Sequence, residues 1–145
     1  MKQKLNLYKL MFDRAKKKQK YFKNYIRYAK IISQRAKRIL NDAEVIIFGS
    51  IVKGNYSIES DIDILIISKK IPESLFEQTK FKDKLLKRFN ANPFELHLAT
   101  PEIYENWFKN FIKDDYIKLW KSEIIMKNFK RKVKNQTAYC IEILN

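Results

Sequence analysis

Glycine is almost absent from this sequence, since the 145 residues contain two glycines, Gly49 and Gly54. A protein of this length with average composition has roughly ten glycines. A chain that uses glycine so sparingly keeps it where the backbone needs a positive φ or comes close to another group. We therefore predict a special backbone conformation, and a functional site, in the segment GSIVKG at residues 49–54.

Cysteine and long apolar runs are also scarce. The single cysteine, Cys140, excludes an internal disulfide and a cysteine-based metal site. Uncharged apolar runs such as residues 64–67 are far too short to span a bilayer. The basic N-terminus lacks the apolar segment and the small-residue cleavage site of a signal peptide, so we expect a cytoplasmic protein. Hydrophobic residues make up 46% of the chain, which is enough for a folded core and argues against intrinsic disorder.

Acidic residues are few, and the excess positive charge is unevenly distributed. The net charge is +15, of which residues 1–43 contribute +12, with 14 basic and 2 acidic residues. Residues 44–100 are neutral, and residues 101–145 contribute +3. The basic N-terminal segment is typical either of a surface that binds RNA or another polyanion, or of a solvated helix face. Lys outnumbers Arg by 25 to 6, which favours the solvated face because Arg is preferred for specific phosphate contacts.

The N-terminal segment has the pattern of a long amphipathic helix. Residues 5–43 contain no proline or glycine, and apolar residues recur every three or four positions with one violation at Lys18. A straight helix of this length spans roughly 55–60 Å, at about 1.5 Å per residue. We expect it either to break near residues 16–20 (KKKQK) or to project from the domain. A projecting apolar stripe needs a partner, such as a second copy of the chain, and folding back is the commoner arrangement.

The rest of the sequence predicts alternating strands and helices in one domain. Pro72 is placed in the first turn of a helix that runs to about Arg88. Thr100 and Pro101 have the pattern of an N-cap followed by the first helical position, in a helix that continues through residues 107–108. Three strands are predicted, at residues 44–48, 62–68 and 94–99. Residues 111–120 fit a helix or, over 116–120, a short edge strand, and residues 122–143 fit a basic helix.

The first strand is followed by a motif suited to phosphate binding. Gly49 and Ser50 lie where the strand ends, and a helical turn from about Ile51 presents backbone N–H groups to phosphate oxygens. The Ser50 hydroxyl and the Lys53 ammonium add further contacts. Gly54 allows the chain to turn back towards the second strand.

Two aspartates begin that second strand. Asp61 and Asp63 are separated by one residue, so on a strand both carboxylates face the same side while residues 62, 64 and 66 enter the core. Two carboxylates so close together are unfavourable unless a cation joins them. Mg²⁺ prefers carboxylate oxygens together with phosphates and water, and a pair of such ions suits displacement at phosphorus.

The third strand carries two more polar residues on one face. Glu95 and His97 alternate with the apolar residues of FELHL. Glu95 is either a solvent-facing strand residue or a member of the site, and His97 is either a hydrogen-bonded strand histidine or a member of the site. In the site, each would act as a metal ligand or as a general base towards an acceptor hydroxyl.

Residues 45–67 (VIIFGSIVKGNYSIESDIDILII) resemble the nucleotidyltransferase signature of the polymerase-β-like superfamily, and most of all its minimal archaeal and bacterial members. A looser resemblance covers residues 94–104 and the basic N-terminal helix. The resemblance implies an α/β fold with a mixed sheet flanked by helices, and Mg²⁺-dependent transfer of a nucleoside monophosphate from a nucleoside triphosphate with loss of pyrophosphate. It assigns the triphosphate to Gly49, Ser50 and Lys53, which replaces a usual Arg, and two metal ions to Asp61 and Asp63. The third carboxylate of the family falls on Glu95 in one alignment and on His97 in another.

The length of the chain predicts a single domain, which the charge and the predicted elements divide into a basic helical segment at 1–43, a catalytic core at 44–100 and a C-terminal helical segment at 101–145. The resemblance also predicts the partners of the chain. Some minimal members are antitoxins that adenylylate a HEPN ribonuclease on a tyrosine, which predicts ATP and a HEPN-type toxin as partners. The competing hypothesis is an inactive module that binds RNA or a protein. The aromatic residues among the N-terminal lysines fit either base stacking or core packing: Tyr21, Phe22, Tyr25 and Tyr28.

Overall fold

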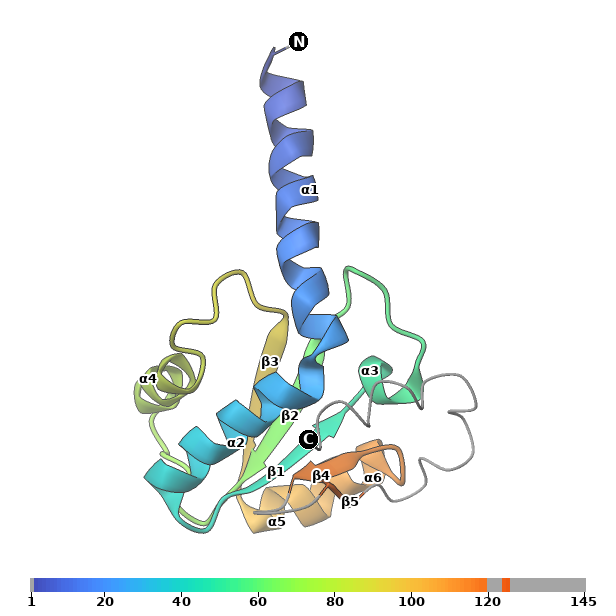
Figure 1. Ribbon diagram of the computed structural model, residues 1–145. Coiled ribbons are helices and arrows are strands. Elements are labelled where there is room, and N and C mark those ends of the chain that lie inside the picture. The colour runs from blue at the N-terminus through green and yellow to red at the C-terminus, as the bar shows by residue number, and fades with distance from the viewer. Residues whose placement is uncertain (1, 120–123, 126–145) are drawn as a thin grey trace.

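The computed structural model describes residues 2–119 and 124–125, which form a mixed five-stranded sheet with helices on both faces (Figure 1). The strand order is β3-β2-β1-β4-β5, in which β2 and β3 are parallel and the other pairs are antiparallel. This confirms the predicted α/β fold. Every helix in the described part of the chain is too short or too polar to cross a membrane. The strands are β1 (Glu44–Phe48), β2 (Ile62–Ile67), β3 (Phe94–Ala99), β4 (Ile117–Leu119) and β5 (Ile124–Ile125). The helices are α1 (Lys2–Lys23), α2 (Tyr25–Leu40), α3 (Ser50–Lys53), α4 (Leu75–Leu85), α5 (Pro101–Ile103), the π-helix η1 (Tyr104–Phe108) and α6 (Lys109–Ile112).

The sheet separates two hydrophobic cores, because successive residues of a strand point to opposite faces. One core lies under α2 and α4 and contains Ile62, Ile64 and Ile66, as the sequence predicted. The other contains Phe48 and Leu65 together with residues of η1 and α6. The second face is therefore the one that carries the odd-numbered residues of β2.

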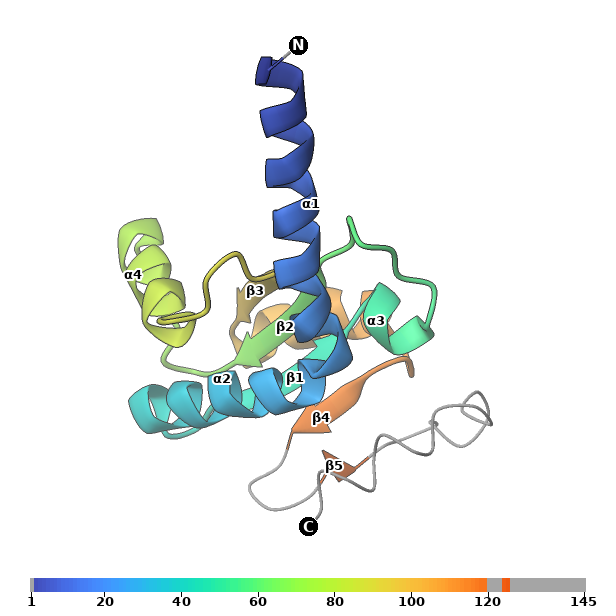
Figure 2. The ribbon, with the colours of Figure 1, turned by 45° about the horizontal axis from the view of Figure 1, so that its top comes forward.

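The N-terminal segment is two helices, and α1 projects away from the sheet (Figures 1 and 2). The helix breaks at Asn24, so the predicted break near residues 16–20 is wrong. The alternative prediction, that the segment projects from the domain, is confirmed for α1, whereas α2 is folded back on the sheet. Residues 16–20 are mostly exposed, and lysine and glutamine are good helix formers. Asn24 has φ −121° and ψ 27°, and its side-chain Nδ2 donates to the Lys20 carbonyl at 3.0 Å. The break occurs where the chain first meets the domain.

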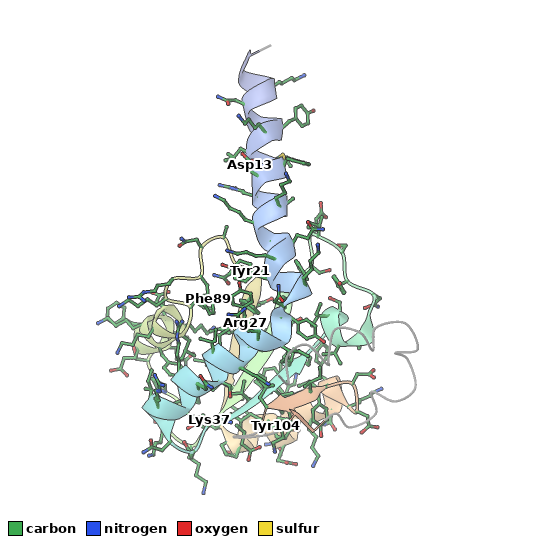
Figure 3. The ribbon with its side chains drawn as sticks, viewed as in Figure 1. Asp13, Tyr21, Arg27, Lys37, Phe89 and Tyr104 are labelled. Atoms are coloured by element: carbon green, nitrogen blue, oxygen red, sulfur yellow. The ribbon has the colours of Figure 1, made fainter. Side chains whose placement is uncertain are left out.

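The base of α1 is anchored by aromatic packing (Figure 3). Tyr21 is 1% exposed, its ring lies 4.7 Å from Tyr28 and 5.6 Å from Phe94 between centroids, and its hydroxyl donates to the Asn90 carbonyl at 3.0 Å. Phe22 is also buried. These contacts favour core packing over base stacking as the role of Tyr21 and Phe22.

Helix α4 begins at Leu75, so the prediction of a helix that starts at Pro72 is wrong. Ser74 takes the N-cap position, and the Pro72 carbonyl lies outside the helix and accepts from Gln78 Nε2 at 2.7 Å. By contrast, Thr100 caps α5 as predicted, because its hydroxyl accepts from the Ile103 N–H at 3.3 Å.

The segment after α6 differs from its prediction. Residues 117–119 form β4, which pairs with both β1 and β5 and is therefore an interior strand. The sequence was compatible with either a helix or an edge strand in this segment. The predicted helix over 122–143 is wrong at residues 124–125, which form β5. Its other residues, including Cys140, lie outside the described residues.

Candidate functional site

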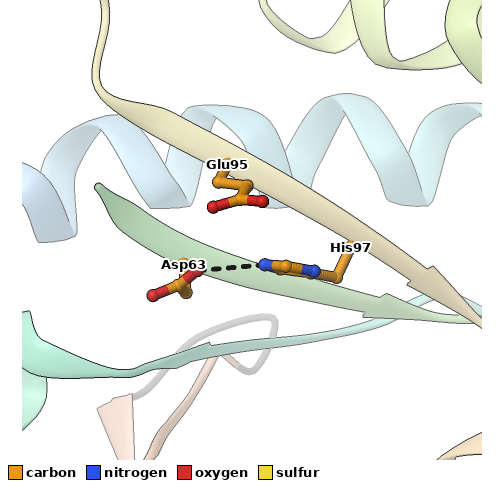
Figure 4. Close-up of side chains that lie close together, drawn as sticks. All are labelled: Asp63, Glu95 and His97. Carbon is orange, nitrogen blue, oxygen red and sulfur yellow. Dashed lines mark hydrogen bonds and ion pairs between the residues drawn. The ribbon is translucent and has the colours of Figure 1, made fainter. Parts of the chain in front are cut away.

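Three polar side chains from two parallel strands form one cluster (Figure 4). Asp63 of β2 lies directly opposite Glu95 of β3, and His97 follows two residues later on the same face. One potential ligand atom from each residue lies within 4.8 Å of the others. The structure therefore brings together three of the four predicted catalytic residues, and it unites Glu95 and His97, which the sequence had treated as alternatives for one position.

His97 is oriented within this cluster. Its Nε2 lies 3.0 Å from Asp63 Oδ1, and the two side chains are 28% and 23% exposed. A carboxylate oxygen accepts hydrogen bonds, so the tautomer that fits this contact has its N–H at Nε2, and that N–H donates a hydrogen bond to Asp63 Oδ1. The imidazole centroid also lies 5.3 Å from that of Phe48 and 6.0 Å from that of Phe108. Glu95 is the exposed member, and it is open to a ligand.

Gly49 approaches this cluster through its backbone. Its φ of +81° is one that side chains rarely allow, and a Cβ built there would lie 2.3 Å from Asp63 Oδ2. Real Cβ atoms essentially never come so close. Antiparallel pairing of Phe48 with Asp63 causes this approach, because Gly49 directly follows Phe48. The glycine motif and the acidic motif, separate in the sequence, are in contact in the structure.

Helix α3 follows immediately, with Gly49 at its N-cap and Gly54 at its C-cap. Gly54 has φ +77°, and its N–H donates to the Ser50 carbonyl at 2.9 Å. Ser50 is half-buried at the start of the turn, and Lys53 is exposed at its end. The roles of Gly49, Ser50 and Lys53 in binding a triphosphate stay predictions.

Asp61 lies outside the three-residue cluster. It is exposed and precedes β2 by one residue, so it is beyond the part of the strand whose alternation fixes side-chain direction. The preceding turn is held by the Ser57 N–H, which donates to Ser60 Oγ at 2.9 Å. The role of Asp61 as a metal ligand stays a prediction.

Sequence reasoning missed the aromatic residues around His97. Phe48 shares a sheet face with Asp63, so strand alternation applied to residues 44–48 could have found it. Phe108 comes from η1, and no local signal predicts that a π-turn brings it to the imidazole.

The donors of the cluster fit a divalent cation. The Asp63 and Glu95 carboxylates are oxygen ligands of the kind that Mg²⁺ takes, usually one or two per ion together with water and phosphate. The His97 imidazole is a ligand more typical of transition metals, and its Nε2 is engaged by Asp63. We therefore assign the cation to the two carboxylates and treat His97 as the residue that orients one of them.

Three known proteins are similar to this chain. A putative protein adenylyltransferase of Methanocaldococcus jannaschii is 37% identical over 71 residues, which cover 49% of this chain and 68% of that protein. The crystal structure of a putative nucleotidyltransferase aligns with a TM-score of 0.50 at 37% identity, over 61% of this chain and 94% of that one. A putative nucleotidyltransferase from Sulfolobus solfataricus aligns with a TM-score of 0.49 at 26% identity, over 73% and 88% of the two chains.

The family match leaves α1 outside and includes the whole sheet and the acidic cluster. It extends over residues 25–136, which is more than half of the chain. The matched region contains the contact between Gly49 and Asp63, so the sequence similarity extends over the candidate site. The chain belongs to the nucleotidyltransferase domain family.

Proposed function

We propose that this protein transfers AMP from ATP to an acceptor hydroxyl and releases pyrophosphate. The observation that carries the proposal is the contact between Gly49 and Asp63, which joins a turn suited to phosphate with a carboxylate suited to a cation. In the reaction the acceptor oxygen forms a bond to the α-phosphorus, and the bond from that phosphorus to the bridging oxygen breaks. The hydroxyl proton passes to a base, and the electron pair leaves with pyrophosphate.

The residues of the site divide into those that bind the triphosphate and those that hold a cation. Gly49, Ser50 and Lys53 bind the triphosphate. Asp63 and Glu95 would hold a divalent cation, with Asp61 as a further carboxylate at the entrance to β2. A bound Mg²⁺ supplies neutralisation of the charge that develops on the phosphate oxygens.

His97 is a positioning residue. Its Nε2–H donates to Asp63 Oδ1 at 3.0 Å, and its ring packs beside both Phe48 and Phe108, so it fixes the rotation of the carboxylate. Residues that orient a ligand in this way are typically worth 10- to 100-fold in metal affinity or activity.

We further propose that the acceptor is a protein hydroxyl and that the partner is a HEPN-type toxin. The protein acceptor is supported by the similarity to the Methanocaldococcus jannaschii protein, which is named a putative protein adenylyltransferase. An antitoxin that adenylylates its toxin is the special case of the family that this acceptor fits.

Label transfer from α-³²P-ATP to a HEPN ribonuclease of the same genome tests the proposal. We expect Mg²⁺-dependent labelling by the wild type, and its loss in Asp63→Asn. The matched control is Asp83→Asn, which removes an exposed carboxylate on α4 and keeps the activity. Labelling that persists in Asp63→Asn, or its absence with every nucleoside triphosphate and with both Mg²⁺ and Mn²⁺, contradicts the proposal.

Two further variants separate the cation ligands from the positioning residue. Glu95→Gln removes a ligand charge, and we expect it to abolish metal-dependent transfer. His97→Gln keeps a donor towards Asp63, and we expect a loss of about tenfold together with a higher metal requirement. Equal losses in the two variants would remove the distinction between their roles.

A second candidate function is RNA binding without catalysis. It is favoured by α1, whose 22 residues include nine basic residues and one acidic residue, Asp13. Single-stranded RNA would then bind with an affinity that falls by about 0.7 log units per log unit of salt for each phosphate neutralised. Salt-independent binding, or none, excludes this function.

A further inference from the structure

We propose that a basic pocket between α2 and α4 binds the phosphate groups of an anionic ligand at a second site, away from the cluster around Asp63. The pocket has a volume of about 280 Å³. It is formed by the last two turns of α2 and by the last turn of α4 with the loop after it. Five of its six lining residues are cations and none of the six is acidic: Arg35, Arg38, Ile39, Lys84, Lys87 and Arg88.

The ends of the two helices explain only part of this positive charge. Cations are favoured at helix C-termini, and α2 and α4 both end at the pocket. Each C-terminus carries an effective charge of about −0.5, so the two ends together offset about one of the five positive charges. About four of the five positive charges of the lining residues are left without compensation by the helix ends, and an anion would relieve their mutual repulsion.

One of the five cations is held rigidly. Arg35 Nη1 donates to the Leu85 carbonyl at 2.7 Å and to the Lys87 carbonyl at 2.9 Å, and its guanidinium carbon lies 4.9 Å from the Phe89 ring centroid. A guanidinium has five N–H donors, and both carbonyls use those of a single nitrogen. Arg35 thus ties α2 to the end of α4 and to the loop after it, and it is one of the residues that line the pocket.

Arg88 has an unusual backbone conformation. Its φ of 72° lies in the left-handed region, where glycine or asparagine is the usual residue. The chain has a long charged side chain there, on the rim of the pocket.

The pocket is remote from the cluster around Asp63. Ser68, which follows the far end of β2, donates to Asp42 Oδ1 just after α2, so α2 ends at the opposite end of β2 from Asp63. A strand of six residues is about 20 Å long. In addition, α2 and α4 cover the other face of the sheet. A nucleotide that reacts at Asp63 therefore does not reach the pocket, whose ligand is a free polyphosphate or the backbone of an RNA.

Binding measurements on a matched pair of variants test this site. The pocket variant is Arg38→Gln with Arg88→Gly, and both residues are exposed. The control is Lys109→Gln with Lys113→Gly on the opposite face, where Lys113 also has a positive φ, of 53°. Each pair removes two charges and places one glycine at a position with a positive φ. The probes are inorganic triphosphate and a short single-stranded RNA, both in EDTA so that no transfer takes place.

We expect the pocket variant to bind at least one probe about tenfold more weakly than the wild type, and the control to stay within about threefold. If the ligand is RNA, the salt slope of binding falls by about 1.4 in the pocket variant, at 0.7 for each lost cation. Loss for triphosphate alone identifies a free polyphosphate, and loss for RNA alone identifies a nucleic acid backbone. Equal affinities in pocket variant and control for both probes overturn the proposal.

Thermal unfolding of the same proteins excludes misfolding as the cause. Arg88→Gly relieves a strained backbone, so the melting temperature of this single variant stays the same or rises. A single Arg88→Gly variant that melts normally and binds both probes as the wild type does also counts against the site. None of these measurements requires the proposed transfer activity, so the two proposals fail independently.

Discussion

The two glycines of this chain are required for different physical reasons. Gly49 has a positive φ and also has no room for a side chain, because Asp63 Oδ2 occupies the place of its Cβ. Gly54 has a similar φ, but no atom lies within 4 Å of its Cβ position. One glycine therefore shapes the site, and the other only allows a turn.

Alanine at each glycine separates these requirements. We expect Gly49→Ala to displace the Asp63 carboxylate and lower the transfer rate by about 10²-fold, which is the typical effect of a misplacement of about 1 Å. Gly54→Ala costs about 1–2 kcal/mol of backbone strain and leaves the transfer rate near that of the wild type. Transfer assays and urea unfolding measure the two effects. Equal losses of activity in both variants would show that the contact with Asp63 has no special importance.

Asp42 links stability to pH. The Ser68 hydroxyl, with a smaller contribution from the Lys69 N–H, lowers the pKa of this carboxyl below 3.8, although desolvation opposes the shift. A group whose pKa is lower in the folded state stabilises the fold above its unfolded pKa, and this contribution is lost as the pH falls through the folded pKa. Unfolding free energies of the wild type and Asp42→Asn should thus converge below about pH 4. The effect is small because Asp42 is exposed. A difference that stays constant down to pH 2 contradicts this origin.

At the scale of elements, α1 has a base that folds with the domain and an outer part that does not. Tyr21→Phe keeps the ring contacts but removes the hydrogen bond to Asn90, and we expect a loss of about 1 kcal/mol in the free energy of unfolding. Tyr21→Ala leaves a cavity and costs about 3–5 kcal/mol, as large aromatic truncations do. Tyr8→Ala, at a side chain that is 68% exposed, stays within about 0.5 kcal/mol. Urea unfolding distinguishes the three variants, and a large effect of Tyr8→Ala would contradict this division of α1.

Strands were more predictable than helix ends. The bounds of β1 and β3 are those expected from the sequence, because buried strands bounded by turn residues have a short-range pattern. The break at Asn24 depends on where Tyr21 meets the loop at Asn90, a contact across 69 residues that no local pattern contains. Pro72 failed as a helix start for a different, local reason, since Gln78 binds its carbonyl and Ser74 takes the cap position.

In the candidate site, too, the local features were predictable and the long-range contacts were not. Strand alternation was enough to place Asp63, Glu95 and His97 each on one face, but only the parallel pairing of β2 with β3 puts them within 4.8 Å. The sequence also did not predict that Gly49 touches Asp63, because that contact needs the antiparallel register of β1 and β2. Residues were thus predictable, and distances were not.

For the whole molecule, the outer part of α1 combines two opposing tendencies. Tyr8, Met11 and Phe12 lie at the spacing of one helix face, and 68%, 59% and 61% of their surfaces are exposed. An exposed apolar face favours association with a second copy. The nine basic residues of α1, set against one acidic residue, oppose it, because two such helices repel each other.

The salt concentration determines which of these two tendencies dominates. Screening shortens the Debye length from about 10 Å at 0.1 M to about 3 Å at 1 M, while the apolar attraction remains. We therefore expect a monomer at 0.1 M NaCl and measurable self-association at 1 M, which sedimentation equilibrium detects. Met11→Ser with Phe12→Ser should abolish the association.

The control concerns a second exposed aromatic surface, where the rings of Trp107 and Phe111 stack with centroids 6.0 Å apart. Phe111→Ser disrupts this surface and should leave the salt-induced association unchanged, because η1 and α6 lie on the sheet face opposite α2 and α4. If Phe111→Ser abolishes association and the α1 variant does not, the contact between copies forms at η1 and α6. Association that weakens as the salt concentration rises would show that attraction between opposite charges holds the copies together. That result contradicts the proposal that repulsion between the basic α1 helices keeps the protein monomeric at low salt.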